Sequence, residues 1–118
     1  MAWNYKRRIC VDFDGTIVDE AIYPNKGKLK EGVIEALNKL RENGFYISIY
    51  SSRNNPELFR HEEKFSQMKE ILLENNIPFD EIIADYKPIA LFYIDDKSIK
   101  FENWNDSIKD ILIRSDNV

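Results

Sequence analysis

The chain has 118 residues, 43% of them hydrophobic and 32% charged, and its single cysteine excludes an internal disulfide and a cysteine-based zinc site. The 17 basic and 21 acidic residues give a net charge of −4, which argues against a broad nucleic-acid-binding surface. No apolar run reaches the ~18–20 residues that a membrane span needs, and no signal-peptide core follows the N-terminus. We therefore expect one cytoplasmic domain over residues 1–118.

The hydrophobic pattern predicts strands that alternate with helices. Such an order favours an α/β fold with a doubly wound, mostly parallel, Rossmann-like sheet and helices on both faces. Sites in these sheets lie at the carboxyl ends of the strands. Pro56 is expected in the first turn of the second helix. The strands are expected at 9–11, 45–50, 81–84 and 89–94, and the helices at 30–43, 56–76 and 105–113.

The residues Asp12-Phe13-Asp14-Gly15-Thr16 directly follow the first predicted strand. Two carboxylates two positions apart leave the strand end together, and Gly15 allows a sharp turn and a close approach to a ligand. Such carboxylates repel each other unless a cation lies between them, and hard oxygen ligands favour magnesium. The alternative is an ordinary Asp-Gly turn in which one aspartate caps the backbone.

A second acidic pair, Asp95-Asp96, follows the fourth predicted strand. In a parallel sheet the two acidic strand ends lie at the same edge. Carboxylates that converge there repel by about 4 kcal/mol per pair at ~4 Å in a medium of intermediate dielectric constant. The combination predicts a metal site that includes Asp12, Asp14, Asp95 and Asp96.

The second predicted strand ends in Ser51-Ser52-Arg53. The serine hydroxyls and neighbouring amides could bind a phosphate, and Arg53 could clamp it with two hydrogen bonds. The alternative is that the serines end the strand and cap the next helix. Lys87 is a candidate to neutralise phosphate charge, although a lysine at this place can equally be an ordinary surface residue.

In their order and spacing these motifs, with Ile17 after Thr16, resemble the haloacid dehalogenase (HAD) superfamily of phosphohydrolases. The similarity spans residues 9–96 and is greatest to small, capless, phosphatase-like members. The resemblance implies that Asp12 attacks phosphorus and forms an aspartyl-phosphate, and that Asp14 acts first as general acid and then as base.

The resemblance further implies that Mg2+ is held by the Asp12 carboxylate, the Asp14 backbone carbonyl and Asp96, with Asp95 in support. Ser51 would bind the transferring phosphoryl group and Lys87 would neutralise it.

The spacing of Lys87 and Asp95 departs from the usual family pattern, in which a helix separates the two motifs. The two residues are only eight positions apart, whereas a parallel crossover takes a dozen residues or more. We therefore expect an extended link, or a short or displaced third strand. Arg53 and Lys97 are the alternative carriers of positive charge.

The chain is too short for a cap domain, so residues 16–29 are expected to form only a short flap. An open site admits bulky substrates or is closed by a neighbouring subunit, which makes a homo-oligomer an expectation. The leading function is a magnesium-dependent phosphomonoesterase acting on a small phosphorylated substrate. The alternatives are a phosphotransferase or mutase of the same superfamily, a receiver-like signalling module, or a catalytically idle metal-binding domain.

Overall fold

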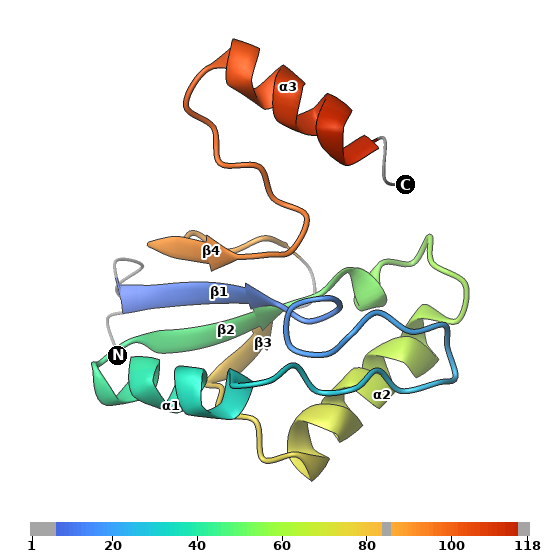
Figure 1. Ribbon diagram of the computed structural model, residues 1–118. Helices are drawn as coiled ribbons and strands as arrows, with labels where there is room; N and C mark the ends of the chain where they lie inside the picture. Colours follow the sequence, from blue (N-terminus) through green and yellow to red (C-terminus); the bar gives the residue numbers. More distant parts are fainter. Residues whose placement is uncertain (1–6, 84–85, 116–118) are drawn as a thin grey trace.

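The computed structural model of the chain describes residues 7–83 and 86–115, and it shows a four-stranded sheet in the order β3-β2-β1-β4 (Figure 1). All three strand pairings are parallel, which confirms the predicted fold class. The strands are β1 (Arg8–Asp12), β2 (Tyr46–Tyr50), β3 (Glu81–Ile83) and β4 (Phe92–Ile94). The helices are α1 (Val33–Glu42), α2 (His61–Glu74) and α3 (Trp104–Ser115), with a short 3-10 turn, η2 (Ser52–Asn54).

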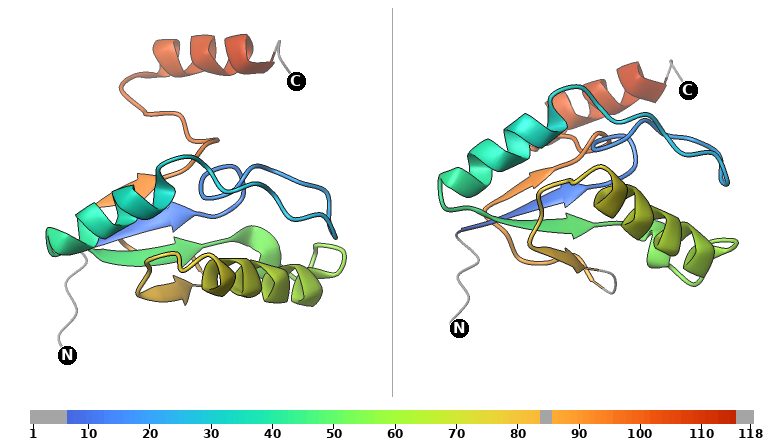
Figure 2. Two further views of the ribbon diagram at one scale, coloured as in Figure 1. Left: turned by 60° about the horizontal axis from the view of Figure 1, so that its bottom comes forward. Right: turned by 90° about the horizontal axis from the view of Figure 1, so that it is seen from below.

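The hydrophobic core lies on one face of this sheet. Ile9 and Val11 of β1 pair with Ile47 and Ile49 of β2, and their side chains point to the same face because side chains alternate along a strand. Helices α1 and α2 pack on that face, as the two views of Figure 2 show. The buried side chains that they add to the core are Leu37, Met68, Ile71 and Leu72.

The opposite face differs from the expectation of helices on both faces, because the described part of the link between β3 and β4 is extended. Residues 84–91 are too few for a helix and two turns, as the spacing of Lys87 and Asp95 indicated. Residues 86–91 cross this face instead. The Tyr93 hydroxyl donates to the Pro88 carbonyl at 2.6 Å, and Arg8 Nη1 donates to the Ile89 carbonyl at 3.4 Å.

The predicted helix at 56–76 begins later than expected, so the placement of Pro56 in its first turn is wrong. The chain first forms η2, whose start is capped by Ser51 Oγ, which accepts from Arg53 N at 3.1 Å. Turns follow, and α2 begins only after Arg60, whose φ is 55°. The other elements form with shifted ends: the strand expected at 89–94 spans only Phe92–Ile94, and Ala84 lies outside the described residues.

Helix α3 forms where a closing helix was expected, but it stands away from the sheet (Figures 1 and 2). Within the described residues it makes no substantial contact with another helix or strand. Its last turn is tied to the preceding segment, since Arg114 Nη1 donates to the Ser98 carbonyl at 3.1 Å. No helix in the described ranges has the length and apolar character that a membrane crossing requires.

Candidate active site

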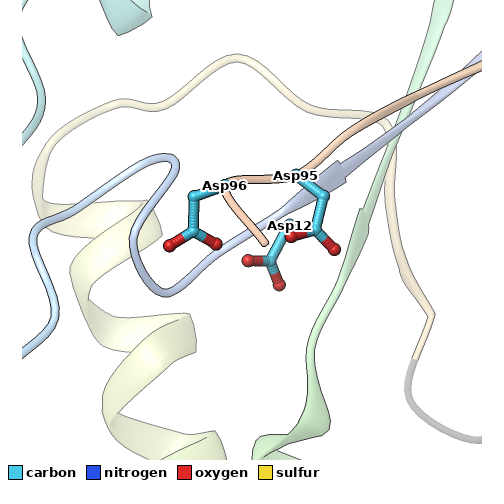
Figure 3. A group of neighbouring side chains, drawn as sticks. All are labelled: Asp12, Asp95 and Asp96. Carbon is cyan, nitrogen blue, oxygen red and sulfur yellow. The ribbon is translucent and has the colours of Figure 1, made fainter. Parts of the chain in front are cut away.

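Three carboxylates meet at the carboxyl edge of the sheet. Asp12 ends β1, and Asp95 directly follows β4. Because Val11 pairs with Ile94, the parallel register brings Asp12 level with Asp95. One carboxylate oxygen from each of Asp12, Asp95 and Asp96 lies within 4.8 Å of the other two, and the three side chains are neighbours in Figure 3. The two acidic motifs are therefore neighbours in space, as expected from the sheet type.

The electrostatics of this acidic cluster (Asp12, Asp95 and Asp96) are those of a cation site. Burial, together with the charges of Asp95 and Asp96, raises the pKa of Asp12 from 3.8 to about 7. Ionising all three groups without a counter-charge is therefore costly. A divalent cation with oxygen ligands removes that cost, so the donor set fits magnesium.

Magnesium should stabilise the protein more at pH 8 than at pH 5.5. The pKa of Asp12 is higher in the folded protein than in the unfolded chain, so folding disfavours its ionised form. The metal-free protein therefore loses stability as the pH rises from about 4 to about 7. Magnesium bound to the ionised cluster would recover this loss, and protons would compete with it at low pH. Thermal unfolding with and without magnesium at the two pH values measures the difference.

An Asp96→Asn variant is the control, and magnesium should raise its Tm much less. An equal increase in Tm at both pH values in the natural protein would contradict the account.

The turn after β1 brings the first motif against the last one. Gly15 has a φ of 82°, a conformation that glycine adopts without strain, and its N–H donates to the Val18 carbonyl at 2.7 Å. A Cβ added at this position would lie 2.2 Å from Asp96 Oδ2. Gly15 is thus required both for the turn and for the close approach of Asp96.

The Asp14 carboxylate is held by Arg53 and is not part of the acidic cluster. Arg53 Nε and Nη2 donate to the two Asp14 oxygens at 2.9 and 2.8 Å. Arg53 Nη1 donates to the Lys64 carbonyl at 2.9 Å and to Gln67 Oε1 at 3.0 Å. Arg53 is buried and its side chain makes four hydrogen bonds, so its observed role is to position Asp14 rather than to offer a free clamp for phosphate.

Ser51 lies one residue beyond Tyr50, which pairs with Asp12. Its oxygen accepts the Arg53 N–H that starts η2, so the capping alternative describes its present contact. That bond uses the oxygen as acceptor and leaves the hydroxyl proton available to a ligand. Ser52 lines a cavity of about 230 Å³ together with Asp14 and Tyr23, on the side of Asp14 nearest the flap.

Of the three candidate cations, Lys87 shares a cavity with Asp12. The two residues line the same small cavity, of about 50 Å³, with Asp95 and Tyr93. Lys87 Nζ lies 4.4 Å from the centre of the Tyr93 ring, a cation–π contact that orients the ammonium group. Lys97 forms an ion pair with Glu20, and the charges of Asp96 and Asp12 add to the effect of Glu20 in raising the pKa of Lys97. The extended link therefore carries Lys87 to the site without a crossover helix.

Sequence reasoning missed two residues that support the site, Gln67 and Tyr93. Gln67 accepts from Arg53 and donates to the Pro24 carbonyl at 2.8 Å, which connects α2 to the flap. The flap itself closes as a hairpin-like loop, where Asp19 N donates to the Lys28 carbonyl at 2.8 Å. The sequence does carry a signal for Gln67. It is a polar residue beside Met68, at a position that belongs to the otherwise apolar stripe of the helix. Nothing in the sequence marks Tyr93.

Comparison with known proteins assigns the family. The model of the haloacid dehalogenase-like hydrolases matches residues 9–76, more than half of the chain. The chain belongs to the haloacid dehalogenase-like hydrolases. The match includes the Asp12–Thr16 motif and Ser51. Lys87, Asp95 and Asp96 lie outside the matched range, and the fold brings them to the same edge of the sheet as Asp12.

The fold of this haloacid dehalogenase-like hydrolase is shared with a solved structure, that of a conserved protein from Bacteroides thetaiotaomicron. The two chains are 23% identical, the alignment covers 92% of each, and the TM-score is 0.61. No curated protein is significantly similar to the chain in sequence.

Proposed function

We propose that this hydrolase is a magnesium-dependent phosphomonoesterase that acts through an aspartyl-phosphate on Asp12. The observation that carries the proposal is the meeting of Asp12 with Asp95, Asp96 and Lys87 at one edge of the sheet. An anionic nucleophile reaches an anionic phosphoryl group only when positive charge offsets their repulsion. Lys87 supplies part of that charge.

In the proposed reaction, an oxygen of the Asp12 carboxylate attacks phosphorus and the bond between phosphorus and the ester oxygen breaks. Asp14 gives its proton to the leaving oxygen, which departs as an alcohol. Asp14 then takes a proton from water, whose oxygen attacks the same phosphorus. Inorganic phosphate leaves and the Asp12 carboxylate is restored, so one difficult step is replaced by two easier ones.

The pairing of Asp14 with Arg53 adds a conformational requirement to this scheme. The bidentate contact occupies both Asp14 oxygens. Before Asp14 can deliver a proton, its side chain must turn away from the guanidinium and take up a proton from water. The adjacent cavity is lined by Asp14 and also by Tyr23, Leu58 and Lys64. A substrate that enters this cavity lies next to the Asp14 side chain as that side chain rotates.

Asp12, Asp95 and Asp96 would hold the magnesium ion, with the Asp14 backbone carbonyl as a further oxygen ligand. When bound, the ion neutralises negative charge on the phosphoryl oxygens. The exposure of Asp95 and Asp96 favours hydrolysis over transfer to a second substrate, because transfer needs water to be excluded.

The decisive experiment is a phosphatase screen over small phosphomonoesters, including a generic aryl phosphate, sugar phosphates and nucleotides. We expect release of inorganic phosphate with magnesium, loss of activity with EDTA, and recovery when magnesium is restored. A chain that folds and binds magnesium but releases phosphate from none of these esters would contradict the phosphomonoesterase proposal. Activity that is indifferent to EDTA would contradict the metal site.

A further inference from the structure

The sheet leaves part of its apolar face uncovered at β4. Phe92 and Ile94 pair with Ile9 and Val11, so their side chains point to the face that carries the core. Yet Phe92 is 58% exposed and Ile94 is 41% exposed. The hydrophobic core thus continues onto an edge strand that no described helix covers. We call the exposed side chains of Phe92 and Ile94 the β4 face.

Helix α3 has the complementary feature, an apolar stripe that no other helix or strand of the described residues covers. Ile108, Ile111 and Leu112 follow the i, i+3, i+4 spacing of one helix face, and Trp104 lies one turn before them. These four side chains, the α3 stripe, are 46–71% exposed. In a soluble protein such a stripe is normally buried against another element.

The segment between β4 and α3 holds the helix away from its own sheet. Asn103 Oδ1 accepts from Asp106 N at 2.9 Å and caps the first turn of α3. Phe101 packs edge-on against Trp104, with ring centres 5.3 Å apart. The Arg114 bond to Ser98 then ties the last turn of α3 to the same segment. Segment and helix form one unit that projects beyond the strands (Figure 1).

We propose that the chain forms a two-fold symmetric dimer in which the α3 stripe of each copy covers the β4 face of the other. A second copy fits better than an unrelated protein because one chain offers both a bare sheet face and a bare apolar helix. A reciprocal exchange buries both surfaces on both copies, which is the self-complementarity of an isologous interface.

The apolar surface available is sufficient for such a dimer. Phe92 and Trp104 are each more than half exposed. At about 150–250 Å² for a whole aromatic side chain, these two rings offer roughly 500 Å² in two copies. The aliphatic side chains beside them bring the total toward the ~1,200–2,000 Å² of a specific interface. The inference depends on this packing alone and not on the proposed activity.

The first test is the mass of the full chain in solution, measured by light scattering or sedimentation over a range of concentrations. We expect twice the mass of one chain for the natural protein and for a Lys109→Asp control on the same helix. Ile111→Asp and Phe92→Asp should each shift the protein to a monomer, at unchanged sheet content by circular dichroism. A monomeric natural protein, or a dimer that both apolar substitutions leave intact, would overturn the proposal.

The second test separates exchange from closure of α3 on its own sheet. A Phe92→Cys, Ile111→Cys double variant is treated with a short bifunctional thiol cross-linker. Burial raises the pKa of the natural Cys10 thiol to about 11, so Cys10 does not compete. The exchanged dimer gives cross-linked pairs of chains on a denaturing gel, and each single variant serves as control. Cross-linking within single chains shows instead that α3 returns to its own β4 and rejects the dimer.

Discussion

An Asp12→Asn variant is expected to lose phosphomonoesterase activity by at least about a thousandfold, since removal of a nucleophile commonly costs several orders of magnitude. The amide that replaces the carboxylate is neutral and is a poor nucleophile for phosphorus. Initial rates of phosphate release from an aryl phosphate, with saturating magnesium, measure the loss.

The same variant should be at least as stable as the natural protein without metal at pH 8. The raised pKa of Asp12 means that its ionised form is disfavoured in the fold, and the amide carries no charge. Asp96→Asn is the matched control, because its activity should recover in part with excess magnesium whereas that of Asp12→Asn should not. Turnover that persists in a folded Asp12→Asn protein would remove Asp12 from the nucleophilic role.

Replacement of Arg53 by alanine is expected to cost about 2–3 kcal/mol of unfolding free energy. Loss of one partner of a buried ion pair typically costs about 3–5 kcal/mol, and the value is lowered here because the Asp14 side chain is 30% exposed. The substitution also removes the donor to Gln67, which links α2 to the flap. Denaturant unfolding measures the change.

Lys87→Ala is the matched comparison for Arg53. Lys87 contacts the face of Tyr93 near the surface, so we expect little change in unfolding free energy but a sharp fall in turnover. Arg53→Lys, which keeps the charge but not the two-pronged contact, should restore only part of the stability. Suppose that Arg53→Ala has the unfolding free energy of the natural protein and Lys87→Ala has its turnover. The structural role of Arg53 and the catalytic role of Lys87 would then have been assigned to the wrong residues.

The acidic cluster was predictable in part. Alternating strands and helices indicate a parallel sheet, whose strands end at the same edge, so Asp12 and the Asp95-Asp96 pair were expected on one side. Their contact also requires β1 and β4 to be neighbours, which follows from the strand order of the structure. The extended link that carries Lys87 was predictable in the same way. Counting residues between two strand ends is enough to exclude a helix.

The contacts of Arg53 were not predictable, because they depend on side-chain rotamers and on α2, 11 to 14 residues further along the chain. The late start of α2 escaped prediction for a related reason. A proline permits a first helical turn but does not require one, and here Ser51 starts η2 instead. The detachment of α3 has no signature in its sequence, whose apolar stripe is the same whether it covers its own sheet or another.

The shortness of β4 has a consequence for how the site responds to its surroundings. Asp95 and Asp96 are attached to the sheet through an edge strand of three residues, whereas Asp12 lies at the end of the buried β1. Segments with few buried apolar contacts fray more easily than core strands, and all three residues of β4 are exposed. Each such fraying event carries two of the three carboxylates away from the third and leaves the core intact. Occupancy of the proposed metal site and the pairing of β4 with β1 would thus be coupled equilibria, in which a bound ion stabilises the last strand of the fold.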